Sequence, residues 1–446
     1  MKNFFNYLIF LILFLSFIFI LGFGSLVKYH YDGGKKYQFL QKSVIFIANV
    51  PMNIRKMIKL RSFDLDKPPI LFKYKDKKRF VQFIKNKRNA ILVLPRYDHS
   101  LSRSVVDIID LNNFKIIHTY KHDSDEMYNQ VKNIKEFSRL KIDYSPIRFR
   151  YRHPILLDDG SLISMHGPIF NIDLCSNLQW INDEETFHHS LMLDHEGNIW
   201  AGGRMSPKSK YVKKYSIEKF IDDSVIKINI DGKILFNKSV TEILIENNIL
   251  SNNFAFITSR MGIFDPIHLN DIEPAFVDTE YWKQGDIFIS VRAQSAIIHY
   301  RPSNNKVINY ITGPFADQHD VDIISDKEIS IFNNNNFFDN NKHSEVLIYN
   351  FETKKFTKLF NNQLQKENFK ATWQGLSHIF KDRSLLVEDH NEGIIILFNS
   401  MGEKEFEFVN KDRNGDIGPL FWSRVIEDDL FIEKFKSSIK NKKCIN

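Results

Sequence analysis

The stretch His189-Ser-Leu-Met-Leu-Asp-His-Glu-Gly197-Asn-Ile-Trp200 decides the fold. Apolar residues that alternate on both sides of an acidic, glycine-containing turn are typical of two β-strands joined as a hairpin. The pattern recurs several times, in complete, stretched and degenerate copies. The further copies are His153–Ile163, His319–Ile331, His378–Val387, one that starts at His268 and resumes at Gly285–Ser290, and a degenerate one from Trp422 to Ile432.

A second hairpin pattern follows most copies. These hairpins are Val225–Phe236, Ala296–Ile308, Glu345–Phe356 and Ile394–Phe406, and an early one, Val105–Ile117, has no strand pair of its own before it. Two hairpins make a four-stranded antiparallel sheet, which is the blade of a β-propeller. We expect the strands near 422–433 to pair with those near 91–120, so that the ring closes and no edge is exposed. The sequence therefore predicts an all-β, six-bladed β-propeller over residues 91–435, with seven blades as the nearest alternative.

The N-terminus carries a different signal. The run Tyr7–Val27 has no charge, lies between Lys2 and Lys28, and is long enough to cross a bilayer as a helix. Its length and its poor small-residue cleavage site favour an uncleaved signal-anchor over a removed signal peptide. We expect a transmembrane segment over residues 1–34, a basic membrane-proximal stalk over 35–90, and a basic tail over 436–446.

Composition excludes several other classes of protein. The chain has 446 residues, 43% of them hydrophobic and 26% charged, which is an ordinary globular composition. The net charge of +7 comes without a basic motif, so nucleic-acid binding is not predicted. Cys175 and Cys444 are the only cysteines, too few for a disulfide scaffold or a thiolate metal cluster. We expect no cofactor, and the sequence does not set the oligomeric state.

The repeated histidines predict the site. The innermost strand of each blade lines the channel of a propeller, so residues at the same repeat position converge on one funnel. The histidines at this position are His189, His268, His319 and His378, whereas His153, which Pro154 follows, is assigned a structural role. Whether His188 or His189 reaches the funnel is left open, and His189 is preferred because it aligns with His319.

Two further side chains suggest what the funnel binds. Asn270 lies two residues after His268, so both point to the same face of a strand. Arg292 ends the strand Ile289–Arg292 and is expected to reach the funnel. A guanidinium beside neutral imidazoles and an amide favours an anion such as a sulfate, phosphate or carboxylate group.

At these residues the chain resembles the bacterial arylsulfate sulfotransferases, which are six-bladed propellers that use no nucleotide sulfate donor. The resemblance covers roughly Tyr144 to Val409, and Gln318-His319-Asp320 with the downstream Phe-Asn is its most specific part. The matching segments are Phe187–Ile199, Ile267–Asn270, Ile289–Arg292, Gln318–Asp320 and Ile329–Asn334. Ser190 departs from the family, in which an acidic residue is common, and the acidic Asp271 and Glu273 lie close to the expected anion site.

The resemblance implies a ping-pong transfer with an aryl sulfate as donor and a phenol as acceptor. His319 would be the nucleophile that forms a sulfohistidine, while His189, His268 and Arg292 would hold the sulfuryl oxygens. Asn270 and His378 are the expected substrate-binding neighbours. With the N-terminal segment as anchor, we expect the propeller in the periplasm, tethered to the bacterial inner membrane. Candidate aromatic walls for the phenol are Phe187, Phe264, Trp282, Phe315, Trp373 and Trp422.

Two other functions remain open. One is a membrane-anchored propeller without catalysis, which serves as a binding or assembly module. The other is a metal oxygenase, since four imidazoles on a propeller axis can hold a non-haem iron, although Arg292 speaks against a metal. The stretch Asn333–Asn341 is interpreted as a flexible loop beside the site without chemistry of its own.

Overall fold

The computed structural model describes residues 2–31, 40, 43–51, 54, 70–85, 88–133, 145–214, 220–249, 265–336, 343–442 and 444. The chain divides into two compact units, residues 1–67 and residues 68–446. Each unit is described by itself. The predicted stalk lies largely outside the described residues up to position 69, and so does Phe264.

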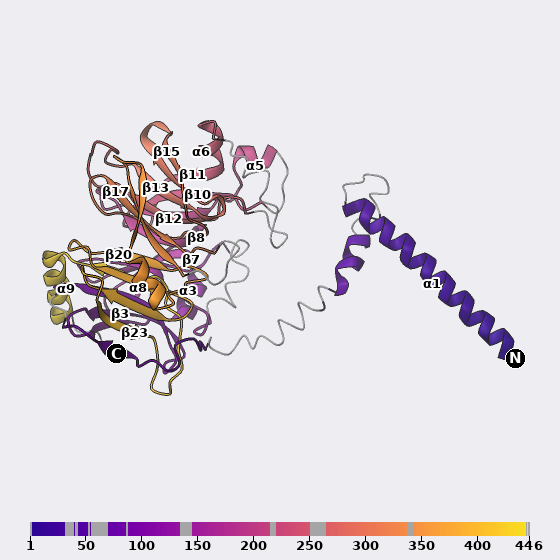
Figure 1. Cartoon of the computed structure of the whole chain (residues 1–446), viewed down its shortest axis with the longest axis horizontal. Helices are drawn as coiled ribbons and strands as arrows, with labels where there is room; N and C mark the ends of the chain where they lie inside the picture. The colour runs from indigo at the N-terminus through magenta and orange to yellow at the C-terminus, as the bar shows by residue number, and fades with distance from the viewer. Residues whose placement is uncertain are drawn as a thin grey trace. The chain divides into compact units, whose positions relative to one another are not determined.

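The first unit is dominated by one apolar helix, α1 (Lys2–Tyr31), drawn in indigo in Figure 1. Its segment Phe4–His30 contains an 18-residue window with a mean hydropathy of 2.7, and no residue of that window is buried. By length and composition this helix is able to cross a membrane, and a signal sequence near the N-terminus passes the same test. Residues 43–51 are also helical.

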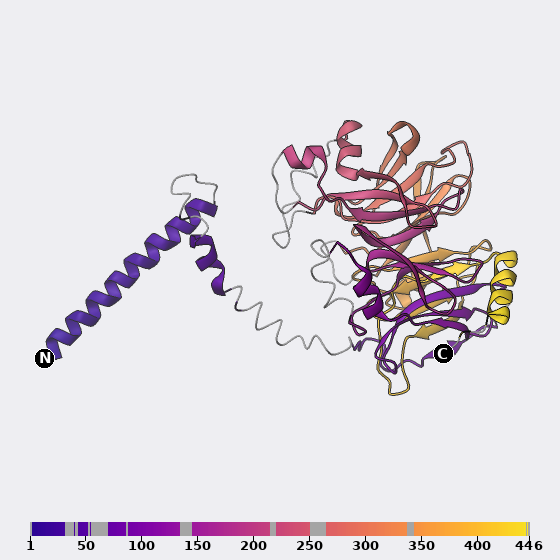
Figure 2. The same cartoon turned by 180° about the vertical axis from the view of Figure 1, so that it is seen from behind.

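The described residues of the second unit form five antiparallel sheets, which Figures 1 and 2 show from two sides. The first four-stranded sheet has the order β24 (Arg424–Ile426), β2 (Ile91–Asp98), β3 (Arg103–Asp110) and β4 (Lys115–Tyr120). The second has the order β12 (Leu269–Pro274), β13 (Ile287–Val291), β14 (Ala296–Arg301) and β15 (Lys306–Thr312). The third has the order β16 (Val321–Ile323), β17 (Glu328–Asn333), β18 (Glu345–Asn350) and β19 (Lys355–Leu359).

The other two sheets are larger. The five-stranded sheet has the order β1 (Phe80–Gln82), β23 (Lys404–Val409), β22 (Ile394–Phe398), β21 (Leu385–Asp389) and β20 (Leu376–Ile379). The seven-stranded sheet has the order β11 (Ile234–Ser239), β10 (Asp223–Ile228), β9 (Ile199–Arg204), β8 (Leu178–Leu193), β7 (Gly167–Ile172), β6 (Leu162–Met165) and β5 (Arg152–Leu156).

The all-β, propeller-like class is thus confirmed, but the prediction of six separate blades is wrong in its count. Four sheets have the size of a blade, and the fifth has seven strands. The reason is β8, whose 16 residues pair with β7 at one end and with β9 at the other. This one strand joins the blades predicted to begin at His153 and at His189.

The predicted hairpins and the closure of the ring are confirmed. Every predicted second hairpin forms an antiparallel pair. The C-terminal strand pairs with the first long strand, with Ile426 opposite Ile91, so strands from the two ends of the second unit share one sheet. This strand is shorter than predicted, because the chain turns into helix α9 (Asp429–Asn441), whose N-cap is Asp428. Ile432 and Phe435 of this helix are buried in the core.

The remaining helices are short. They are α3 (Ser124–Gln130), α5 (Lys210–Lys214), α6 (Val240–Glu246), α8 (Asn361–Lys366) and the 3₁₀ turns η1 (Arg292–Gln294) and η2 (Pro302–Asn304). Cys175 and Cys444 form a disulfide, with their Cα atoms 5.3 Å apart and a sequence separation of 269 positions. This bond fixes the end of the chain beyond α9.

Buried carboxylates tie each sheet to the next one along the chain. A buried polar group needs a hydrogen-bond partner, and each of these carboxyl groups accepts a backbone N–H from the following sheet. The links are Asp223 to Leu269 (2.8 Å), Asp271 to Val321 (2.9 Å), Asp320 to Ser377 (2.9 Å) and Glu388 to Trp422 (3.0 Å). They hold the sheets in a fixed relation at the place where the strands converge.

Candidate functional site

The sheets begin with a strained residue at the point where they converge. Residues there adopt the left-handed backbone conformation, which costs about 1–2 kcal/mol for a residue other than glycine. They are His153 (φ 39°), His189 (φ 66°), His268 (φ 49°), Asp317 (φ 58°), Gln374 (φ 65°) and Trp422 (φ 69°). The strand pairing shifts register beside three of them, as in a β-bulge that re-aims a side chain. Strain of this kind gathers at functional sites.

The structure brings together three of the four predicted histidines. The ring of His189 lies 5.5 Å from that of His268 and 6.3 Å from that of His319, measured between centroids. Trp422 contacts the rings of His189 and His319 at 6.4 and 6.3 Å. We name His188, His189, His268 and His319 together with Arg292 the imidazole cluster.

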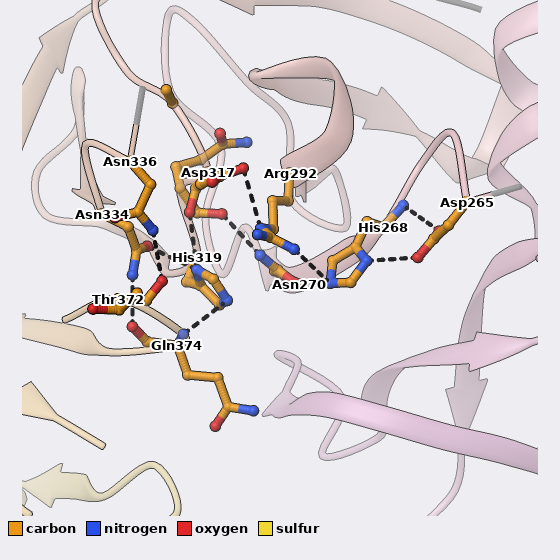
Figure 3. Close-up of polar contacts among 12 residues, drawn as sticks. Asp265, His268, Asn270, Arg292, Asp317, His319, Asn334, Asn336, Thr372 and Gln374 are labelled. Atoms are coloured by element: carbon orange, nitrogen blue, oxygen red, sulfur yellow. Dashed lines mark hydrogen bonds and ion pairs between the residues drawn. The ribbon is translucent and has the colours of Figure 1, made fainter. Parts of the chain in front are cut away.

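His319 is held in one tautomer. Its Nδ1 lies 2.7 Å from Asn334 Oδ1 and 3.0 Å from the carbonyl oxygen of Asp317, so Nδ1 carries the proton and donates it (Figure 3). The Asn334 amide is itself fixed, since its Nδ2 donates to the carbonyls of Ala371 (2.9 Å) and Gln374 (2.7 Å). Nε2 of His319 therefore has the free electron pair, which accepts the backbone N–H of Gln374 at 3.2 Å.

Burial keeps this imidazole neutral. The side chain of His319 is only 3% exposed. Burial lowers the pKa of His319 to about 3, and the nearby Arg292 guanidinium acts in the same direction. Burial, followed by the neighbouring imidazoles, lowers the pKa of His189 well below its usual value. At neutral pH both rings are uncharged bases.

A chain of polar contacts places Arg292 beside the histidines (Figure 3). Asp265 Oδ2 accepts the Nδ1–H of His268 at 2.6 Å, so His268 Nε2 is an acceptor and lies 3.4 Å from Arg292 Nη1. On its other side, Arg292 Nε lies 3.3 Å from Asp317 Oδ1. The guanidinium also lies over the half-exposed ring of Trp373, 5.8 Å from its centroid. Arg292 thus reaches the predicted place, with its orientation set from both sides.

Asn270 and His188 each make a hydrogen bond that supports another residue of the site. Asn270 is fully buried, and its Nδ2 donates to the carbonyl of Gln318 at 2.8 Å, so it anchors the backbone next to His319. His188 is also buried, and its Nδ1 lies 2.7 Å from Nδ1 of His189. The sequence left open which of the two adjacent histidines reaches the funnel, and the structure joins them by a hydrogen bond.

His378 lies elsewhere. It lines a cavity of about 260 Å³, together with residues from six strands that the sheets bring together, and its Nε2 is 3.6 Å from Glu427. The same cavity is lined by Glu273, Asp320, Asp322 and Arg424, and we name it the carboxylate cavity. The repeat misplaced His378 because the left-handed residue of this strand is Gln374, four positions earlier.

Burial and mutual repulsion raise the pKa values of carboxyl groups in and near the carboxylate cavity. Burial raises the pKa of Asp322 to about 6 and that of Glu273 well above its usual value. Asp271 lies close by, and burial raises its pKa to about 7. Arg424 is the partly buried cation among these carboxylates, and its guanidinium donates to the carbonyl oxygens of Pro154 (3.2 Å) and Leu191.

Sequence reasoning missed several residues of the site. Asp265 and Asp317 orient Arg292 and the histidines, and Asp265 stands three residues before His268, a spacing that a search for carboxylate partners would have found. Asn334 was placed in a stretch without chemistry, and it contacts the predicted nucleophile instead. A further hollow of about 10 Å³ beside the cluster is lined by Arg152, His189, Gln374, His390, Phe421 and Trp422.

The aromatic candidates divide into two groups. Trp373 and Trp422 lie at the imidazole cluster. Phe187, Trp282 and Phe315 are buried in hydrophobic cores. Among the side chains that the structure describes, no group of three or more His, Cys, Asp or Glu residues is arranged to hold a metal ion.

Fold and site together define a propeller-like protein whose sheets converge on neutral imidazoles and one oriented guanidinium. The model of the arylsulfotransferase (ASST) family matches residues 153–411, more than half of the chain. The chain belongs to the arylsulfotransferase family, and its function is arylsulfotransferase-like.

Comparison with solved structures adds distant likenesses. A protein of unknown function from Bacteroides caccae superposes with a TM-score of 0.47 at 10% identity, over 77% of this chain and 100% of that chain. Virginiamycin B lyase from Staphylococcus aureus superposes with a TM-score of 0.35 at 10% identity, over 76% of this chain and 97% of that chain. At these values neither likeness carries an argument about function. None of the curated proteins matches this sequence.

Proposed function

We propose that this protein moves a sulfuryl group from an aryl sulfate to a phenolic acceptor in two steps, through a sulfohistidine on His319, without a nucleotide sulfate donor. The observation that carries the proposal is the state of His319. Its Nδ1–H is committed to Asn334 and its pKa is low, so Nε2 is an uncharged nucleophile at neutral pH. Arg292 lies beside it with donors suited to an anion.

In the first step, the Nε2 electron pair of His319 attacks sulfur, and the bond between sulfur and the aryl oxygen breaks. The backbone N–H of Gln374, which occupies Nε2 at 3.2 Å, moves aside and donates to a sulfuryl oxygen. Arg292 donates to the other sulfuryl oxygens, while His268, held by Asp265, orients the guanidinium. Each such preorganised donor is worth about 3–4 kcal/mol of transition-state stabilisation.

In the second step, a phenolic acceptor takes the place of the released phenol and attacks the sulfur of sulfohistidine. Trp373, half exposed beside Arg292, is the aromatic wall for both rings. Asn270 acts through the backbone rather than on substrate, because its amide is buried against the Gln318 carbonyl. His378 takes no part in this proposal, since it lies in the carboxylate cavity.

We place the enzyme at the bacterial inner membrane, anchored by α1, with the propeller-like unit in the periplasm. Two features support this location. The helix is able to span a bilayer. The Cys175–Cys444 disulfide belongs to an oxidising compartment, because cytosolic thiols are kept reduced.

The test uses the full chain in detergent without any nucleotide sulfate. Release of nitrophenol from 4-nitrophenyl sulfate is followed with and without added phenol. We expect release that depends on the acceptor in the wild type and in His195→Ala, whose side chain is exposed, and no release in His319→Ala. Without acceptor, intact-mass measurement of the wild type is expected to gain one SO₃ group, and His319→Ala none.

Two outcomes would contradict the proposal. Equal activity in the His319→Ala variant would exclude a sulfohistidine on His319 as the intermediate. A folded wild-type protein that releases nothing from several aryl sulfates would favour the binding or assembly module.

A further inference from the structure

Two adjacent histidines share a single proton. Nδ1 of His188 and Nδ1 of His189 are 2.7 Å apart, and their rings meet at 84° with centroids 4.9 Å apart. At this distance one nitrogen must donate and the other accept. The contact leaves Nε2 of His189 as the nitrogen that is available to a substrate in the cluster.

A buried carboxylate stands behind the pair. Asp223 Oδ1 lies 3.3 Å from His188 Nε2, and only 3% of the Asp223 side chain is exposed. Its other oxygen accepts the backbone N–H of Leu269 at 2.8 Å, so the carboxylate cannot turn away. Burial opposes the ionised form of Asp223, but His188 and the Leu269 amide outweigh it and lower the pKa of the carboxyl. The Asp223 carboxylate therefore stays charged behind His188.

The charges around His189 act against a proton there. His188, His268, His319 and Arg152 all disfavour its protonated form, in addition to burial. Near Asp223, Arg204 is a further cation. A proton held by the histidine pair is therefore disfavoured on His189, the ring that meets the substrate, and the Asp223 carboxylate stands at the other end of the pair.

We propose that Asp223, His188 and His189 form a proton relay that protonates the leaving phenolate and later takes up the proton of the acceptor phenol. This inference rests on the proposed sulfuryl transfer. His189 is the group that touches the substrate oxygen. His188 and Asp223 are positioning residues that act through it.

The proton balance closes over the two steps. In the proposed relay the pair starts with three ring protons: one on Nε2 of His188, one between the two Nδ1 atoms, and one on Nε2 of His189. As His319 attacks and the sulfur–oxygen bond breaks, the Nε2 proton of His189 passes to the aryl oxygen, and the proton between the Nδ1 atoms moves onto His189. In the second step the acceptor phenol gives its proton to Nε2 of His189, the proton between the Nδ1 atoms moves back to His188, and the starting arrangement is restored.

The relay makes a prediction about leaving groups. A nitrophenolate is a stable anion and leaves without a proton, whereas the more basic phenolate ion requires one. General acid catalysis contributes about 10²–10⁴-fold where the proton is needed. We expect the His188→Gln variant to lose about that factor in kcat/KM on phenyl sulfate, and to keep most of its activity on 4-nitrophenyl sulfate.

The experiment compares the two donors in the wild type, His188→Gln, Asp223→Asn and the control His195→Gln, using the full chain and a fixed acceptor. Asp223→Asn retains an oxygen for the Leu269 amide and removes the charge, so the same donor selectivity is expected with a smaller loss. Equal losses on both donors, or no loss on either, would overturn the relay and leave His188 a structural residue. Activity of the wild type on 4-nitrophenyl sulfate and its gain of SO₃ test the proposed function separately.

Discussion

The imidazole cluster and the carboxylate cavity lie along the same converging strands and have opposite chemistry. In the cluster, burial lowers the pKa of His189 and His319 and keeps both neutral. In the cavity, burial raises the pKa of Asp322 and Glu273 and favours their neutral forms too. Trp422 contacts His319 on one side and His153, which lines the cavity, on the other.

The comparison shows that positions a few residues apart on the same strands can have opposite chemical environments. Near the strained residues, the strands present nitrogen bases and a guanidinium. A few residues further along the same strands they present carboxylates, several of which bind the backbone of the next sheet. In the proposed function the first region binds an anion, whereas the second links each sheet to the next.

The largest effect is expected when the cluster loses its cation. Arg292→Ala should lower kcat/KM for an aryl sulfate by about 10²–10³-fold, because a preorganised donor to the sulfuryl group is removed. Since Arg292 lowers the pKa of His319, the acid limb of the pH profile should also move to higher pH. Arg301→Ala is the control, as that guanidinium is bound to Asp286. Equal losses in both variants would mean that Arg292 only stabilises the fold.

The next effect concerns the tautomer of His319. Asn334→Ala should lower kcat by about 10²-fold, the cost of a misplaced reacting group, because Nδ1 of His319 loses the closer of its two acceptors. The control Asn336→Ala removes a nearby amide that donates only to the carbonyl of Thr372. Steady-state kinetics at neutral pH measure both variants. An unchanged kcat in Asn334→Ala would show that Asn334 is not required to hold the tautomer of His319.

A substitution in the carboxylate cavity should change the free energy of unfolding. The pKa of Asp322 rises from 3.8 to about 6 on folding, so its contribution to stability is present below pH 4 and is lost as the pH rises through 6. Asp322→Asn should therefore raise the free energy of unfolding at pH 8 by on the order of 2 kcal/mol, with the gain vanishing toward pH 4. Thermal unfolding across this pH range, with the exposed Asp326→Asn as control, measures it. A gain that is independent of pH would contradict the assignment.

The smallest effect on catalysis is expected at His378. Because its ring lies in the carboxylate cavity, His378→Ala should change kcat/KM by no more than about twofold, the range of substitutions remote from a site. The comparison is with His268→Ala, which removes the partner of Arg292. Matching losses in these two variants would place His378 in the cluster after all.

The sequence predicted the repeat and most of the cluster for a physical reason. Strand alternation and turn residues recur with the sheets, so His189, His268 and His319 could be placed at equivalent strand starts without coordinates. Arg292 followed from its place at a strand end. The count of sheets could not be predicted in the same way, since nothing in the residues before His189 marks β8 as one strand of 16 residues.

Other parts of the site depend on contacts that leave no local pattern. Asn334 reaches His319 because the chain after β17 returns to the convergence of the strands, and a run of asparagines does not reveal this. His378 was misplaced because the start of its strand is set by a left-handed residue, which a repeat alignment does not see. The Cys175–Cys444 bond spans 269 residues, a separation at which spacing says nothing about pairing.

The links from each sheet to the next have a consequence for synthesis of the protein. Glu388 holds the backbone of Trp422, and Trp422 contacts the rings of His189 and His319, so a residue made late in translation completes the surroundings of residues made much earlier. A chain that stops before residue 422 contains every imidazole of the cluster and lacks the tryptophan that two of them contact. Activity would thus begin only after residue 422 has been made, and products that stop before it would be inactive.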